Sequence, residues 1–432
     1  MKKFFLIIFC IIIFPLSAFS ATLKEALKQT FYNNLELKAE RKNLEIQQEV
    51  INMSRSDLLP SLTLSSTKNF EDTNKLTNQS GGDASITDTD TMTSSIKLEQ
   101  TLLDGSGRKT EYEKSKLGLN LTEAKLVKKE QEIFLRAIEA YTGLILAYEK
   151  LNINEENVNL LQRQFELDNA RLSRGQITAS DLAQSQSSLA GAQARYIEAQ
   201  NNIVTSKLNY ENVIGAIAAK EKLKKIYNAQ VSIPKNLGEA KKISLEKSPE
   251  LIIAEIEYGQ SELDVKIARS DLSPTAKISL ERTYTDDLSA TYDEREKDVL
   301  QATVSWPFQF GGKNKSNVSK NLQAKGMKRL LLENAQKNNT QSVTSSWSTL
   351  QSSRSFLQAV QSQVKASEVA TEGISFEYES GSGRSTFDVL QSRSNLINAK
   401  INLAEAERSY LLAQYRVLKS IGLLNSNYLN LK

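Results

Sequence analysis

Several residue types are scarce in this chain of 432 residues, and each scarcity excludes a class of function. The sequence has no histidine, which removes the commonest general base and the commonest metal ligand. Only 6 prolines and 18 glycines are present, which is few for a loop-rich enzyme but compatible with long uninterrupted helices. Lysine and arginine total 55 against 51 acidic residues, without the concentrated basic face of a nucleic-acid binder.

The N-terminus has the pattern of a secretory signal peptide. Two lysines precede an apolar run over residues 4–14, and the triplet Ala18-Phe19-Ser20 has the small residues of a cleavage site. We therefore expect residues 1–20 to be removed. The single cysteine, Cys10, lies inside the run, so the mature chain is expected to have no disulfide. A non-cleaved anchor is the alternative, but the run is too short to span a bilayer as a helix.

The remaining sequence is duplicated. Residues 54–60 read SRSDLLP and residues 268–274 read ARSDLSP, so five of seven positions match at a shift of 214. Farther along, a shift of 207 relates Asp181 to Asp388, Gln184 to Gln391 and Ile214-Gly215 to Ile421-Gly422. Two ordered series of matches predict two repeats, 21–215 and 237–422, with a linker or equatorial segment at 216–236 and a C-terminal tail at 423–432.

Each repeat follows the same order of elements. A helical segment ends before Pro60 or Pro274, and period-two alternation then predicts a pair of strands. A very long helix, a glycine-containing break and a last helix follow. The predicted ranges are 22–57 and 237–271 for the first helices, 61–103 and 275–308 for the strand pairs, 108–172 and 314–379 for the long helices, and 180–214 and 386–421 for the last helices.

The last helix of each repeat carries a seven-residue pattern. In the first repeat one row is large (Leu189, Tyr196, Ile203) and its partner row is small (Ser185, Ala192, Ala199). A strict seven-residue repeat predicts a left-handed coiled coil. Large residues on one edge and small residues on the other favour a curved wall of helices. An ordinary antiparallel coiled coil is the alternative reading of the same pattern.

The strands indicate how the chains assemble. Four strands cannot close a barrel, and an open sheet edge is excluded from a bilayer because its backbone groups would have no partner. Three chains would supply twelve strands, within the range of outer-membrane barrels. The expected fold class is mainly α with a transmembrane β-barrel portion: a duplicated long-helix repeat that forms a trimeric α-helical barrel and a 12-stranded β-barrel.

Over residues 22–422 the chain resembles the TolC family of outer-membrane efflux proteins. The resemblance rests on Leu23-Lys24-Glu25-Ala26-Leu27, the two Ser-Asp-Leu-x-Pro junctions, the segment 306–312 and the segment 378–390. It implies a non-enzymatic exit duct of a tripartite efflux pump or type I secretion system, without a cofactor. The implied partners are two further copies of the chain, a periplasmic adaptor, an inner-membrane transporter and outer-membrane lipid.

The resemblance also implies a gate at the periplasmic end. Tyr378 and Arg384 match the pair that holds the inner helices shut by bonding the neighbouring turn near Asp181, and Asp388 matches the acidic ring at the constriction. Gln391 stands where the family pattern has a second acid, so a weaker ring is expected. The alternatives are a surface pair between Arg384 and Asp388 and simple packing of Tyr378.

Three glycines, Gly175, Gly381 and Gly383, are the expected hinges of these turns. One residue is inserted between Gly381 and Arg384 relative to the family pattern, so a rearranged turn is expected there.

Two other interpretations remain at this point. Asp83, Asp88 and Asp90 could form a calcium loop, but the ordered ligand spacing is missing, and a solvated extracellular loop is favoured. A periplasmic coiled-coil adaptor would share the signal peptide and long helices, but would not need two strand pairs.

Overall fold

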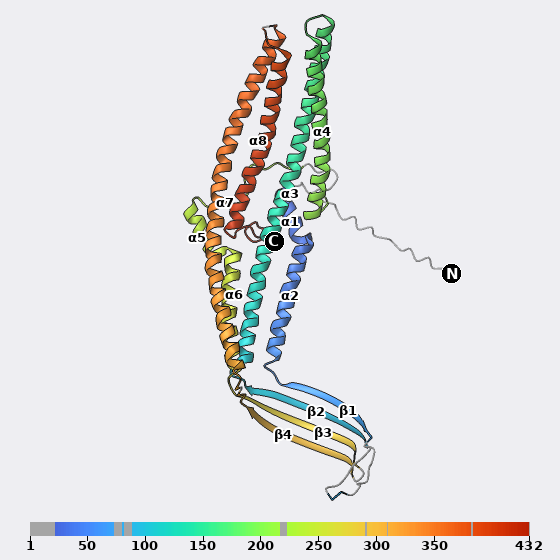
Figure 1. Cartoon of the computed structure of the whole chain (residues 1–432), viewed down its shortest axis with the longest axis vertical. Coiled ribbons are helices and arrows are strands. Elements are labelled where there is room, and N and C mark those ends of the chain that lie inside the picture. The colour runs from blue at the N-terminus through green and yellow to red at the C-terminus, as the bar shows by residue number, and fades with distance from the viewer. Residues whose placement is uncertain are drawn as a thin grey trace, which may run out of the picture. The chain divides into compact units, whose positions relative to one another are not determined.

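The computed structural model describes residues 22–72, 80–81, 89–216, 223–289, 292–308, 310–381 and 383–431 (Figure 1). The expected signal peptide 1–20 and two loop aspartates, Asp83 and Asp88, lie outside the described residues. The first repeat contains α1 (Leu23–Asn33), α2 (Leu35–Ser56), β1 (Ser61–Glu71), β2 (Thr89–Leu103), α3 (Gly107–Ser173) and α4 (Ala179–Val213). The second contains α5 (Leu237–Lys247), α6 (Pro249–Ser270), β3 (Thr275–Ser289), β4 (Tyr292–Ser305), α7 (Lys313–Glu379) and α8 (Thr386–Ser420).

The first helical segment of each repeat is broken in two, where the sequence predicted one helix over 22–57 and one over 237–271. At Asn34 the chain is extended, and the Asn34 Oδ1 accepts from the backbone N–H of Glu36 and of Leu37, which caps α2. At the equivalent break, Ser248 is extended and Pro249 begins α6. A proline at the first helical position fits a new helix, because its missing N–H would have no partner there. Local capping therefore overrides the continuous pattern.

The four strands form one antiparallel sheet in the order β1-β2-β3-β4, as the strand count in the sequence predicted. The middle pair, β2 and β3, joins the two repeats. Residues opposite one another in the register share a face of the sheet. Leu62, Leu98, Leu280 and Leu300 form one row on one face. The adjoining row on the other face is Ser61, Glu99, Ser279 and Gln301, so one face is apolar and the other is polar at this level.

The long helices have equal lengths in the two repeats. Both α3 and α7 have 67 residues, and both α4 and α8 have 35. At 1.5 Å per residue the long helices extend about 100 Å. In α4 the small-row residues Ser185, Ala192 and Ala199 are buried, whereas in the large row Leu189 is buried and Tyr196 and Ile203 are partly exposed. The partly exposed section of the large row is available to a neighbouring helix.

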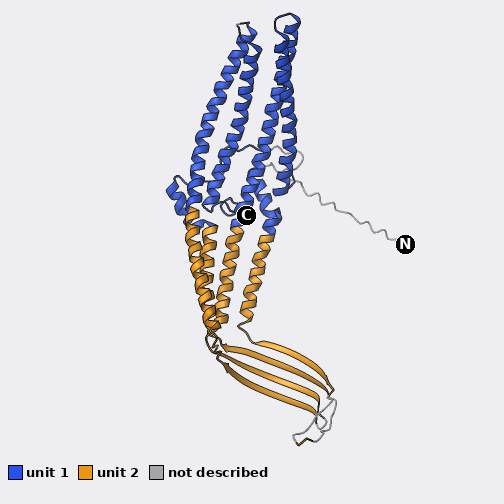
Figure 2. Ribbon diagram, viewed as in Figure 1, with its two compact units in different colours: residues 1–38, 128–248, 340–432 blue, residues 39–127, 249–339 orange. Residues whose placement is uncertain are grey.

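The chain divides into two compact units that cut across the repeats (Figure 2). One unit consists of residues 1–38, 128–248 and 340–432, and the other of residues 39–127 and 249–339. The second unit holds the sheet with the adjoining helical segments. The first unit holds the helical hairpins, the linker and the tail, and each unit takes matching segments from both repeats.

The core of the first unit gathers helices from both repeats with the C-terminal tail. Phe134, Tyr141, Tyr415 and Leu418 are almost completely buried. The tail joins this core, because Leu424 and Leu431 are fully buried and the Ser426 N–H donates to Glu130 Oε2 at 3.2 Å. Apolar burial of this kind is the main favourable contribution to folding.

Among the described residues, no helix combines the length and the apolar character needed to cross a membrane.

Candidate gate at the ends of the helical hairpins

The turns that end the long helices depend on left-handed backbone. Gly175, Gly381 and Gly383 have φ angles of +71°, +76° and +82°, a region that side chains with a Cβ rarely adopt. Nothing lies within 4 Å of a Cβ built at any of the three glycines, so only the backbone conformation requires them. Ser382, between two of these glycines, lies outside the described residues. The predicted hinge residues thus form the turns; their motion stays a prediction.

Asp181 and Asp388 lie in the first turn of the last helices of the two repeats. Each carboxylate accepts from the N-cap backbone N–H, of Thr178 at 2.9 Å and of Ser385 at 3.0 Å, which completes a capping box in each repeat. These backbone hydrogen bonds hold the pKa of both aspartates below the ordinary value. The two aspartates that the duplication relates therefore have the same local role.

Tyr378 joins helices from both repeats, but through a different residue from the one that the sequence predicted. Its hydroxyl donates to Asp168 Oδ1 of α3 at 2.9 Å and lies 3.0 Å from Thr386 Oγ1 of α8. The predicted partner was the turn near Asp181. Within this chain the Tyr378 hydroxyl donates to Asp168, while the Asp181 carboxylate accepts from Thr178 in its own cap.

Asp168 is the buried centre of the cluster. It is 0% exposed, and it also accepts from Gln164 Nε2 at 2.9 Å and from the Ser185 hydroxyl of α4. Together with Tyr378 and Thr386, these contacts unite α3, α4, α7 and α8. A buried carboxylate is costly unless it is hydrogen-bonded, and this one receives three hydrogen bonds.

Positive charge and burial complete the environment of the cluster. The Arg171 guanidinium lies 4.2 Å from the centroid of the Tyr378 ring, within the range of a cation–π contact. Burial raises the pKa of Tyr378, and the Asp168 carboxylate raises it further, so the phenol remains a proton donor. We call Asp168, Ser185, Tyr378, Thr386 and Arg171 the tip cluster.

Asp168 was missed in the sequence, although a signal was present. Residues 154, 157, 161, 164 and 168 of α3 follow the three-and-four spacing of a coiled-coil seam, and they are Asn, Asn, Leu, Gln and Asp. All five are buried. A charged residue at the end of a polar seam requires partners from facing helices, and those partners are far away in the sequence.

Arg384 and Asp388 do not form a direct contact in the described chain, so the alternative of a surface pair between them is not seen there. Arg384 Nε instead donates to Glu377 Oε2 at 2.6 Å, and both side chains are about half-exposed. Asp388 and Gln391 line a groove of about 220 Å³ together with Thr371, Ile374 and Phe387. Gln391 Nε2 donates to Asn395 Oδ1 at 3.0 Å.

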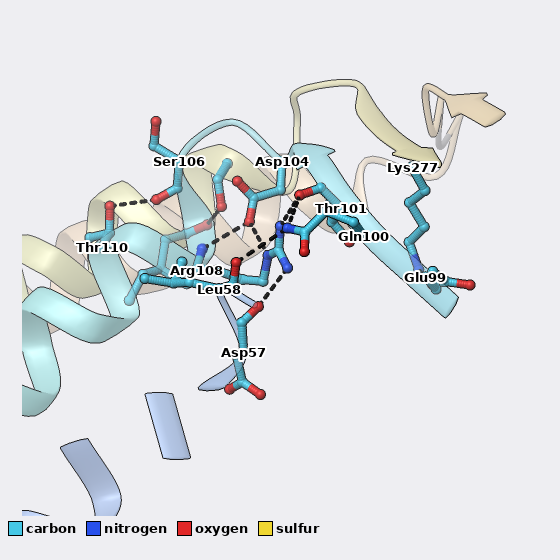
Figure 3. Close-up of polar contacts among 12 residues, drawn as sticks. Asp57, Leu58, Glu99, Gln100, Thr101, Asp104, Ser106, Arg108, Thr110 and Lys277 are labelled. Atoms are coloured by element: carbon cyan, nitrogen blue, oxygen red, sulfur yellow. Dashed lines mark hydrogen bonds and ion pairs between the residues drawn. The ribbon is translucent and has the colours of Figure 1, made fainter. Parts of the chain in front are cut away.

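A second polar cluster fixes the junction between helix and strand in the other unit (Figure 3). Arg108 donates to the Asp57 carbonyl at 2.6 Å, to the Thr101 carbonyl at 2.8 Å and to Asp104 Oδ2 at 3.0 Å. Gln100 Nε2 donates to the Leu58 carbonyl at 3.2 Å. Three separate segments are therefore tied at the point where the chain leaves α2.

The second repeat builds this junction with different side chains. Asn314 Nδ2 donates to the Asp271 carbonyl at 3.0 Å, and Trp306 Nε1 donates to the Leu272 carbonyl at 3.1 Å. Asp271 and Leu272 are the repeat equivalents of Asp57 and Leu58, at the shift of 214. The acceptors are thus kept in the duplication, while the donors differ.

Among the described residues, no group of three or more histidine, cysteine, aspartate or glutamate side chains is placed to hold a metal ion. The aspartates Asp83 and Asp88 lie outside that part of the chain. The clusters found instead join helices and strands to one another, as expected for a structural subunit of a duct.

The fold and the duplicated hairpins define a class of long-helix channel subunits, and the comparisons with known proteins agree. The family model for outer membrane efflux proteins matches residues 26–216 and 242–423, so the chain belongs to that family. It is 25% identical to the outer membrane efflux protein BepC of Brucella suis, over 96% of this chain and 88% of BepC. It is 21% identical to TolC of Escherichia coli, over 95% and 85% of the two chains.

A solved structure shows the same fold. The CmeC outer membrane channel of Campylobacter jejuni superimposes with a TM-score of 0.81 at 17% identity, over 93% of this chain and 86% of CmeC. The TolC-type resemblance drawn from the motifs is confirmed. The chain is an outer-membrane channel protein with periplasmic helices, and it is not an enzyme. The adaptor alternative is wrong, because the family model covers both repeats.

Proposed function

We propose that three copies of this chain form the exit duct of an efflux pump or type I secretion system, and that the tip cluster is its periplasmic gate. The observation that carries the gate is the Tyr378–Asp168 hydrogen bond, which ties α7 of the second repeat to α3 of the first at the turns of the hairpins. Opening the duct at this end requires the hairpins to separate, and this bond is what they must break.

Unpaired strand edges support the trimer. In the order β1-β2-β3-β4, the outer strands β1 and β4 each leave one row of backbone groups without a strand partner among the described residues. In a bilayer such edges must be paired, because lipid offers no hydrogen bonds. Pairing β1 of one chain with β4 of the next closes twelve strands, an even number within the known range of such barrels.

The chemistry of the tip cluster suits a gate that partners must open. A hydrogen bond to a charged group contributes about 1.5–3 kcal/mol, which is strong enough to hold a closed state and weak enough to be broken by a docking protein. In a trimer three copies act together. A wholly apolar seal would be harder to open and would expose apolar surface when open.

Arg384, Asp388 and Gln391 have proposed roles beyond the chain itself. Among the described residues Arg384 pairs with Glu377 and is about half-exposed, so we propose that it can also reach the Asp181 turn of a neighbouring copy. Asp388 is proposed to line the constriction, and Gln391, one helical turn farther, leaves that ring with a single acid per chain. The proposed partners are a periplasmic adaptor and an inner-membrane transporter, which select the cargo.

Tyr378→Phe tests the gate directly. It removes the phenol hydroxyl, so trimers carrying it should show larger or more frequent single-channel currents in planar bilayers than the parent. Adding Arg384→Ser should increase the effect. Tyr148→Phe is the matched control, since Tyr148 is an exposed tyrosine of α3. If Tyr378→Phe trimers conduct like the parent, the gate lies elsewhere.

A further inference from the structure

The linker contacts one helix from each repeat at the base of the hairpins. Lys225 Nζ lies 2.5 Å from Glu149 Oε1 of α3 and 2.5 Å from Glu407 Oε2 of α8. The Tyr141 hydroxyl of α3 donates to the Lys224 carbonyl at 2.8 Å, and the Ala229 N–H donates to Gln414 Oε1 of α8 at 2.8 Å. We call Lys225 with its two carboxylates the linker clasp.

The linker clasp is partly shielded from water. The side chain of Lys225 is 30% exposed, and those of Glu149 and Glu407 are 25% and 16% exposed. A cavity of about 20 Å³ lies among these residues, Tyr141 and Arg408, with room for about one water molecule. Burial lowers the pKa of Lys225, but the two carboxylates outweigh it, and the net shift is upward. The lysine therefore stays charged.

The clasp belongs to a longer series of contacts between α3 and α8. Lys150 Nζ lies 2.5 Å from Glu405 Oε1, Arg408 Nη2 donates to the Glu139 carbonyl at 3.1 Å, and Arg416 Nη2 donates to Glu139 Oε1 at 3.0 Å. Lys150, later on α3, lies beside Glu405, earlier on α8, and Glu139, earlier on α3, lies beside Arg408 and Arg416, later on α8. This is the order of two antiparallel helices in one fixed register.

The same register reaches the tip cluster. Asp168 of α3 and Thr386 of α8 meet there through the hydroxyl of Tyr378. From Lys150 to Asp168 is about 27 Å along α3 at 1.5 Å per residue. Hydrogen bonds keep their strength only over a few tenths of an ångström in length. A displacement of α8 along α3 at the base is carried by the rigid helices to the tip, where it breaks these bonds.

We propose that Lys225 is a positioning residue for the gate: it fixes α8 against α3 at the base, so that Tyr378 meets both Asp168 and Thr386 at the tip. This inference rests on the proposed gate. It assigns the linker a part in channel closure, and it links closure to a charge network that salt weakens. Because the clasp is partly exposed, raising the ionic strength should act on the parent in the same direction as removing Lys225.

Single-channel recording with a set of variants tests the inference. Lys225→Met keeps the length of the side chain and removes its charge. We expect it to form trimers and to open about tenfold more often, the factor that corresponds to the loss of two partly exposed ion pairs of about 0.7 kcal/mol each. Lys225→Arg should restore parent behaviour. Lys224→Met is the matched control. It makes the same change at the preceding residue, whose exposed side chain forms no ion pair in the described part of the chain.

The double variant decides whether Lys225 acts through the tip. If it does, Lys225→Met with Tyr378→Phe should open no more often than Tyr378→Phe alone. If the two substitutions raise the opening frequency additively, the inference is overturned. It is also overturned if Lys225→Met opens as often as the parent while Tyr378→Phe opens more often. If neither single variant opens, the gate proposal itself fails. Should Lys225→Met not assemble, Glu407→Gln, which leaves one carboxylate to Lys225, must still raise opening, and an unchanged channel would refute the inference.

Discussion

Arg171 and Tyr378 occupy equivalent positions of the two repeats, 207 residues apart, and they stack on each other with the guanidinium 4.2 Å from the ring centroid. Duplication thus brought two copies of one position into contact, and the copies have diverged into complementary side chains. The contact lies beside the Tyr378–Asp168 hydrogen bond and reinforces it.

The stacking contact should contribute measurably to closure. Arg171→Leu removes the cation while keeping an apolar side chain, and a cation–π contact of about 1 kcal/mol corresponds to roughly fivefold more frequent opening. Single-channel recording measures this. Arg163→Leu, on an exposed position of the same helix, is the control. Equal behaviour of the two variants would mean that the stacking has no part in closure.

Asp168 should be more sensitive to truncation than to loss of charge. Asp168→Ala removes the acceptor of three buried donors, at about 1–3 kcal/mol for each donor that finds no other acceptor, whereas Asp168→Asn keeps one carbonyl oxygen. Thermal melting of the helical signal in detergent should therefore fall far more for the alanine variant. If Asp168→Ala melts at the same temperature as the parent, the buried carboxylate does not stabilise the hairpins.

The charge of Asp388 should govern block by multivalent cations. Asp388→Ala should weaken block at the periplasmic side, and Gln391→Asp, which adds an acid one turn along α8, should strengthen it. The Ser385 N–H lowers the pKa of Asp388, so the carboxylate stays charged, and block persists, as the pH falls to below the usual range of aspartate.

The same lowered pKa has a consequence for the capping box. Because the folded pKa lies below the unfolded value, the stabilisation by the capping box is present above the unfolded pKa and is lost as the pH falls through the folded one.

The position of the acidic ring can be contradicted in two ways. If block by multivalent cations disappears at a pH well above the usual pKa of an aspartate, or is unchanged in Asp388→Ala, the acidic ring lies elsewhere.

The two faces of the sheet should respond differently to charge. Leu98 lies in the row of four leucines, and Leu98→Arg at the lipid-facing midplane should cost about 2–4 kcal/mol and reduce membrane assembly. Ser95 points to the other face, so Ser95→Arg is the control and should assemble normally. Heat-resistant trimers in outer-membrane fractions are the measurement. The reverse pattern would mean that the faces are assigned wrongly.

The number of chains in the assembly can be measured from its mass. Native mass spectrometry in detergent should give the mass of three mature chains, because the edges of β1 and β4 need partners. A folded, stable monomer with intact strands would contradict the trimer and, with it, the closed duct.

The sequence by itself determined the elements and their duplication. Period-two alternation placed four strands, and the scarcity of proline and glycine allowed two helices of 67 residues. These features are local: a strand pattern or a missing helix breaker acts within a few residues. The breaks at Asn34 and Ser248 were missed, although they are also local. A single capping side chain gives a weaker sequence signal than the continuous helical pattern around it.

Only the tertiary structure decided which side chains meet. Tyr378 was a candidate from the family resemblance, but its partner Asp168 lies 210 residues away on α3, and the linker clasp joins residues from three separate segments. Asp181 was the expected acceptor, and its own capping box uses it instead. A contact between distant segments depends on the register of two packed helices, which is set by all the side chains of their seam together. No single motif in the sequence carries that register, so the side-chain contacts at the turns could not be derived from the sequence alone.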